Sequence, residues 1–145
     1  MKLLKNIFLL FFCAGLLSCS SAEYIISEQN CSVADIRKAV LGTIGEPRTV
    51  SENERMYFSR YFSRKPDPKF DAKKSKERLF AKILILGDRR PYDISVEVIA
   101  EKLINGTYEE SGFSAVDAKK MGVDLRKKLH QSLEGRNVID DFRPF

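Results

Sequence analysis

The fold is decided by the stretch from Leu79 to Val98, which reads LFAKILILGDRRPYDISVEV. Leu79 to Leu86 are apolar except for Lys82, which suits a central strand, although a buried helix segment has the same pattern. Gly87 to Pro91 is a turn signal. Apolar and polar residues then alternate from Tyr92 to Val98, as in a half-buried strand. Because so short a link cannot form a parallel crossover, the stretch predicts an antiparallel hairpin.

Two amphipathic helices are predicted, one on each side of this hairpin in the sequence. Ser32 with Asp35, and Ser114 with Asp117, have the serine-to-acid spacing of a capping box. Apolar residues follow each serine at helical spacing, and the first helix should end within residues 42–45, before a proline. The residues that line the expected core-facing side are Val33, Ile36, Val40, Leu41 and Ile44 in the first helix, and Ala118, Met121, Leu125, Leu129, Ser132 and Leu133 in the second.

Further strands are expected around the hairpin. Met56–Arg64 contains the tandem repeat YFSR-YFSR, whose aromatic density favours a strand. Asn105-Gly106 predicts a second hairpin turn, and Asn137–Phe145 either an edge strand or a segment lying across the sheet. The expected fold class is α+β, with an antiparallel sheet of three to four strands and two amphipathic helices packed on one face. In the repeat, the two expected strand faces are Tyr57, Ser59, Tyr61 and Ser63, and Phe58, Arg60, Phe62 and Arg64.

The first eighteen residues have the anatomy of a secretory signal peptide. Lys2 and Lys5 form a basic start, and eleven uncharged residues follow from Ile7 to Leu17. A membrane-spanning helix needs about 20 apolar residues, so this run is too short for one. The alternative is a buried core helix, of which a mixed polar and apolar face would be expected, and the run has no such face. We therefore predict that residues 1–18 are a cleaved signal peptide.

The end of this leader, Leu16-Leu17-Ser18-Cys19, resembles the lipobox of bacterial lipoproteins. That pattern is a leucine, two further residues of which the second is small, and a cysteine; Leu17 is bulkier than the pattern prefers. The resemblance implies that Cys19 carries a diacylglyceryl thioether with fatty acids such as palmitate, and becomes the first residue of the mature chain. Two serines and no aspartate follow, which in this family implies sorting to the outer membrane. The alternative is ordinary cleavage after Ser20-Ser21-Ala22, which would discard Cys19.

The mature chain has the size of one domain. Removal of residues 1–18 leaves 127 of the 145 residues, and lowers the net charge from +5 to +3 because the leader holds two lysines and no acids. We expect residues 19–30 to be a lipidated polar tether and residues 31–145 a single α+β domain. With Cys19 acylated, no disulfide within the mature chain is expected, and Cys31 is better explained as a small packed residue than as a reactive thiol.

A basic stretch, Lys65–Arg78, is predicted to be a mobile surface loop, because it combines two prolines with many charges. Its excess of positive charge could contact anionic headgroups, at about 1 kcal/mol per basic residue near the surface. The alternative is a solvated loop without a ligand. The candidate contact residues are Lys65, Lys69, Lys73, Lys74, Lys76 and Arg78.

No catalytic arrangement is recognisable in the sequence. His130, the single histidine, lies among lysines without partners at the spacing that catalysis or metal binding requires. The acidic pairs Glu109-Glu110 and Asp140-Asp141 match no calcium-binding loop. Arginines between aromatic residues in the YFSR repeat could stack on bases, but a net charge of only +3 argues against nucleic-acid binding. The sequence therefore predicts no catalytic residue, no metal site, no cofactor and no nucleic-acid partner.

Three hypotheses for function remain. The first is a lipid-anchored, periplasm-facing module that binds an envelope protein or an anionic envelope polymer, or helps to assemble the envelope. The second is a periplasmic enzyme with a site built from dispersed carboxylates and tyrosines, and the third is a purely structural lipoprotein. The predicted element order resembles, in architecture alone, that of small domains of outer-membrane assembly lipoproteins.

Overall fold

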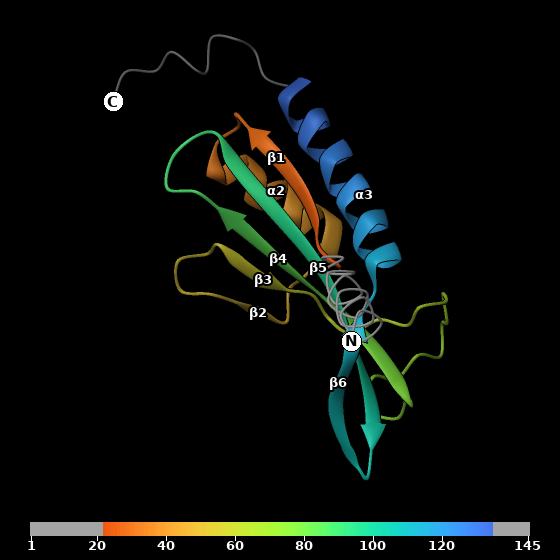
Figure 1. Ribbon diagram of the computed structural model, residues 1–145. Helices are drawn as coiled ribbons and strands as arrows, with labels where there is room; N and C mark the ends of the chain where they lie inside the picture. The colour runs from red at the N-terminus through yellow and green to blue at the C-terminus, as the bar shows by residue number, and fades with distance from the viewer. Residues whose placement is uncertain (1–21, 135–145) are drawn as a thin grey trace, which may run out of the picture.

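The computed structural model describes residues 22–134, which form one antiparallel sheet with two helices. The strands are ordered β1-β5-β4-β3-β2, and β6 pairs with β5 on the same edge as β1 (Figure 1). The elements are β1 (Tyr24–Gln29), α2 (Val33–Ile44), β2 (Thr49–Val50), β3 (Met56–Phe58), β4 (Glu77–Leu86), β5 (Tyr92–Ile104), β6 (Thr107–Phe113) and α3 (Ala115–Glu134).

The β4–β5 hairpin is the centre of the sheet, as predicted. Its register places Ile83 opposite Val96 and Ile85 opposite Ile94, and all four side chains are buried. Both strands are longer than the predicted segments, because β4 begins at Glu77 and β5 continues to Ile104. The alternation of apolar and polar residues from Tyr92 to Val98 therefore predicted which face of β5 is buried.

Both helices pack on one face of this sheet. The main core cluster joins Ile36 and Val40 of α2, and Leu125 and Leu129 of α3, to the inward side chains of β4 and β5. The other face of β4 carries Arg78, Phe80, Lys82, Leu84 and Leu86 and contributes nothing to either core cluster. We call this second side of the sheet the open face.

Both ends of α2 follow the predicted capping chemistry. The Ser32 side chain accepts a hydrogen bond from the backbone N–H of Asp35, and the Asp35 side chain accepts one from the Ser32 N–H, which together make a capping box. The chain leaves α2 at Gly45, where φ is 70° and the N–H donates to the carbonyl of Leu41 at 2.9 Å. Neither helix within residues 22–134 is long and apolar enough to span a bilayer.

The prediction of three to four strands is wrong, because residues 22–134 alone form a sheet of six. Part of the difference is β1: Tyr24–Gln29 pairs with β5, although residues 19–30 were expected to be a tether. The strand escaped recognition because only Ile26 is fully buried among its six residues, as is usual for an edge strand with one covered face. The remainder of that tether before residue 22, and Asn137–Phe145, lie outside the described residues.

The tandem repeat forms a strand only in part. β3 covers Met56–Phe58, and the next contact with β4 is an isolated bridge between Phe62 and Leu79. Phe58 lies opposite Lys82, so one extra residue is accommodated between Phe58 and Phe62, as in a β-bulge. Phe62 therefore packs in the core with Leu79, whereas Tyr61 packs edge-on against Phe80 at 5.8 Å on the open face. The predicted single alternation of faces across both repeats is wrong for this reason.

Candidate functional site

The open face of the sheet is a network of aromatic rings and ion pairs. Lys82 Nζ lies 2.9 Å from Glu97 Oε2, and Arg78 Nε lies 2.7 Å from Glu101 Oε2. Each pair joins residues that lie directly opposite each other in β4 and β5. These cross-strand pairs fix the side chains of the open face against one another.

Arg78 is the centre of this network. Its Cζ atom lies 3.8 Å from the ring centroid of Tyr61 and 3.4 Å from that of Tyr108, so the guanidinium contacts both rings. The Arg78 side chain is only 14% exposed. The charge and the planar group of Arg78 thus already have partners within the domain, which distinguishes it from the five lysines predicted with it as contacts for anionic surfaces.

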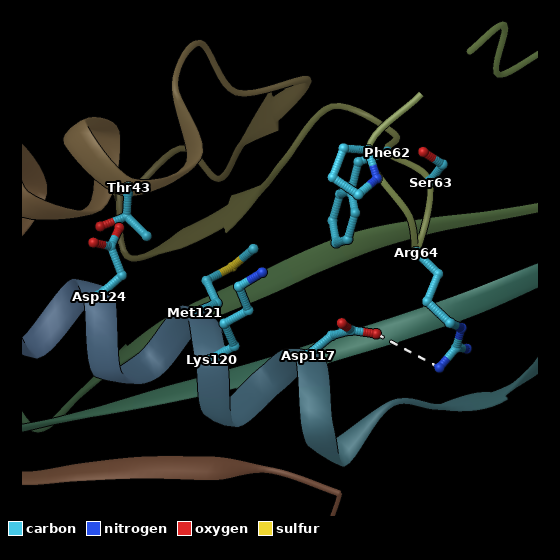
Figure 2. A pocket seen from close by; sticks show the side chains of 9 residues that line it. Thr43, Phe62, Ser63, Arg64, Asp117, Lys120, Met121 and Asp124 are labelled. Atoms are coloured by element: carbon cyan, nitrogen blue, oxygen red, sulfur yellow. Dashed lines mark ion pairs between the residues drawn. The ribbon is translucent and has the colours of Figure 1, made fainter. Parts of the chain in front are cut away.

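A cleft of about 390 Å³ lies on another side of the molecule, between α3, the end of α2 and the segment after Phe62. Figure 2 shows Thr43 and Asp124 at one end of the cleft, and Arg64 and Asp117 at the other. The lining residues are Thr43, Phe62, Ser63, Arg64, Pro66, Asp117, Lys120, Met121 and Asp124.

Both carboxylates of the cleft already have basic partners. Asp117 Oδ2 accepts a hydrogen bond from Ser114 Oγ at 2.6 Å and lies 3.7 Å from Arg64 Nη1. Asp124 Oδ2 lies 2.8 Å from Lys128 Nζ, which also donates to the Gly42 carbonyl at 2.5 Å. Asp117 thus connects α3 to the segment after Phe62, whereas Asp124 pairs within α3 with Lys128, which in turn contacts α2. The cleft therefore suits the binding of a small polar or mixed group better than general acid–base chemistry.

The basic loop, residues 65–76, is the part of the predicted stretch Lys65–Arg78 that precedes β4, and its five lysines are all exposed. Two aspartates make turns within it: Asp67 accepts from the backbone N–H of Lys69, and Asp71 from that of Lys73, each at 2.9 Å. The Lys73 hydrogen bond, aided by the charge of Lys74, lowers the pKa of Asp71 below its usual range. The exposed residues are Lys65, Lys69, Lys73, Lys74 and Lys76.

The loop is attached to the domain at both ends. The backbone N–H of Leu103 donates to the Lys76 carbonyl at 2.9 Å, and the Tyr108 hydroxyl donates to the Ser75 carbonyl at 2.8 Å. At the other end, Arg64 Nη1 lies 3.4 Å from Ser114 Oγ, just before α3. The loop therefore spans the end of the domain, from the first turn of α3 to the β5–β6 hairpin.

Cys31 and His130, two further candidates from the sequence, do not line the cleft. Cys31 is buried in the main core cluster, at 1% exposure, which agrees with a packed residue. His130 is exposed on α3. Cys19, the predicted lipidation site, lies outside the described residues. No group of three or more histidine, cysteine, aspartate or glutamate side chains within residues 22–134 could hold a metal ion.

Sequence reasoning did not identify the cleft. Asp117 and Asp124 are seven residues apart, which places them on the same side of α3, and this spacing was the one available signal. Arg64, the residue that lies 3.7 Å from Asp117, follows the bulge between Phe58 and Phe62, and the sequence gives no sign of that bulge. Comparison of the chain with protein-family models, with curated proteins and with solved structures finds no match.

Proposed function

We propose that this protein is a lipid-anchored lipoprotein that faces the periplasm, and that its domain binds an envelope component or assists envelope assembly. The observation that carries the proposal is Cys19, at the end of a sequence that resembles a lipobox and five positions before the first strand at Tyr24. The outer membrane is the proposed location, because two serines rather than an aspartate follow Cys19.

The short link between anchor and domain supports this function. Five residue steps from Cys19 to Tyr24 span at most about 18 Å when fully extended. Two or more acyl chains anchor stably, whereas one binds only marginally. A diacylated Cys19 would therefore hold the domain directly at the bilayer surface, where it can meet only partners within or close to that membrane.

Two surfaces are available for a partner. The cleft offers a concave, mixed lining with charges at both ends, and the open face offers aromatic and charged side chains in fixed positions. We favour the cleft as the binding site, because concave sites bury more of a bound group than a flat face does. The enzymatic alternative gains no support from the cleft, since each of its two aspartates has a basic partner.

The proposal is tested by mild crosslinking in cells at native expression, followed by purification of the protein from membranes. We expect an envelope protein, or an anionic envelope polymer, to be recovered with the wild-type chain. Recovery should decrease for Lys120→Glu, which reverses a charge in the cleft lining, and should persist for Lys127→Glu, an exposed α3 residue that does not line it. Recovery of the wild-type protein alone would contradict the binding function and favour the structural alternative.

A further inference from the structure

We infer that the basic loop, residues 65–76, lies against the anionic phospholipid headgroups of the same bilayer that holds the lipid anchor. This inference rests on the proposed lipidation of Cys19. It adds an orientation: one end of the domain faces the membrane and the opposite end faces away from it.

The first argument is where the N-terminal chain enters the sheet. Tyr24 pairs with Val96 on the outer edge of β5, while Phe113 of β6 pairs with Ile99 on that same edge. The backbone N–H of Ser114 donates to the Val98 carbonyl at 2.8 Å. Because this carbonyl is occupied, residues 22–23 do not extend β1 along β5, and the described chain enters the sheet beside Ser114.

The point where the chain enters β1, beside Ser114, lies at the same end of the domain as the basic loop. Ser114 is also the residue that Arg64 contacts, immediately before the loop. Figure 1 shows β1 starting beside the first turn of α3, at the end of the molecule from which the β5–β6 hairpin and the loop between β3 and β4 project. A lipid on Cys19, at most about 18 Å from Tyr24, therefore brings this end of the domain to the bilayer.

The second argument is the distribution of charge. The loop contains five lysines and two aspartates, a net charge of +3. The mature chain without the leader also has a net charge of +3, so the remainder of the protein is neutral as a whole. The entire charge excess is thus concentrated in twelve residues at the end where the anchor would enter, which is the arrangement expected for contact with anionic lipids.

The third argument is that the loop displays these charges outward. Of its lysines, only Lys74 makes a salt bridge among the described residues, with Asp71 at 3.6 Å, and its side chain remains 84% exposed. Two apolar side chains flank this point of entry in the same region: Phe113 is 54% exposed and Val116 is 78% exposed. Basic and apolar side chains together match the chemistry of a headgroup layer over acyl chains.

The inference is tested with the full-length mature protein, purified from membranes with its anchor and reconstituted into vesicles. An environment-sensitive fluorophore is attached through Lys73→Cys in one sample and through Asp88→Cys in another. Asp88 lies in the exposed β4–β5 turn, and the ten residues of β4 separate it from the loop, about 30 Å at the rise of a strand. Cys31 is buried, so the introduced thiol is the one that reacts.

Vesicles of phosphatidylcholine alone are compared with vesicles that also contain phosphatidylglycerol, both with a headgroup-attached quencher. We expect quenching at position 73 in the anionic vesicles, no quenching at position 88, and loss of the signal in high salt or when the other four loop lysines are replaced by glutamine. The inference would be overturned by equal quenching at both positions, or by quenching at position 73 that is the same with and without phosphatidylglycerol and at low and high salt.

The same experiment distinguishes this inference from the proposed function. Protein that floats with the vesicles while position 73 stays unquenched would retain its anchor and refute only the orientation. Protein that fails to float at all, with an unmodified mass, would refute the lipidation on which the orientation rests.

Discussion

The ring of Tyr24 in β1 lies directly against Gly122 of α3. A Cβ atom placed on Gly122 would be 2.0 Å from Cδ1 of Tyr24 and 2.8 Å from its Cγ. The guanidinium of Arg126, one turn further along α3, lies 5.6 Å from the centroid of the same ring. The absence of a side chain at 122 therefore allows β1 to pack on α3, next to the point where the described chain enters the sheet.

Gly122→Ala should destabilise the domain. Overpacking costs about 1–3 kcal/mol, which outweighs the roughly 1 kcal/mol that alanine gains over glycine in helix propensity. Gly42→Ala in α2 is the matched control, because its Cβ would meet Lys128 Cδ at an ordinary 3.6 Å, and it should be neutral or stabilising. Urea unfolding of both variants measures the difference; equal stabilities would contradict the close packing of Tyr24.

Arg78→Ala should cost about 2 kcal/mol, because it leaves Glu101 largely buried without its charged hydrogen-bond donor. Arg78→Lys should recover only part of this loss, since lysine restores the charge but not the planar contact with two rings. The exposed pair of Arg60 and Glu46, with side chains 69% and 75% exposed, provides the comparison: Arg60→Ala should cost under about 1 kcal/mol. Unfolding midpoints that rank Arg60→Ala as the more damaging change would refute this account of the open face.

The raised pKa of Tyr57 predicts that the stability of the domain decreases at alkaline pH. Its burial, opposed by Arg37 and reinforced by Glu54, raises the pKa of its phenol above the usual value. A group with a raised folded-state pKa contributes stability that is complete below its unfolded pKa, about 10, and that is lost as the pH rises through the folded pKa. Stability should therefore fall above about pH 10, and fall less steeply in Tyr57→Phe.

The Tyr57→Phe variant should also lose about 1 kcal/mol at neutral pH, because the Tyr57 hydroxyl donates to the Glu54 carbonyl at 2.9 Å. Denaturant unfolding at several pH values measures both effects. The same alkaline slope in the wild type and the variant would show that another group is responsible.

The lowered pKa of Asp71 predicts how substitutions in the basic loop change the titration of its carboxyl group. The largest cause of its lowered pKa is the backbone N–H of Lys73, ahead of the charge of Lys74. Lys74→Gln should therefore leave most of the depression in place, whereas Lys73→Pro, which has no N–H, should move the pKa toward its ordinary value. The stability that Asp71 contributes is present above that ordinary value and is lost as the pH falls through the folded pKa. Carboxyl titration by NMR measures this directly; a full return to the ordinary pKa in Lys74→Gln would reverse the assignment.

The regular parts of the fold could be predicted from the sequence because their signals are local. The alternation in Tyr92–Val98 and the capping box at Ser32 each depend on residues that are close together in the sequence. The α+β class, the central hairpin and both helices follow from such signals. The edge elements did not follow, since Tyr24–Gln29 has a single fully buried residue and its strand conformation depends on pairing with β5.

The candidate site was less predictable, because distant segments build it. The YFSR repeat suggested one continuous strand, but a bulge separates Phe58 from Phe62, and Arg64, which follows it, lies 3.7 Å from Asp117. Arg78 appeared as one more basic residue of the loop, and only the pairing of β4 with β5 places it beside Glu101. Charge composition identified the basic loop, but not that it lies at the end where the N-terminal chain enters.

The intact mass of the mature protein, extracted from membranes, tests the central claim most directly. The account predicts a chain that begins at Cys19 and carries the added mass of a thioether-linked diacylglycerol. A soluble, unmodified chain that begins at Glu23 would contradict it, and would remove the membrane from both the proposed function and the proposed orientation.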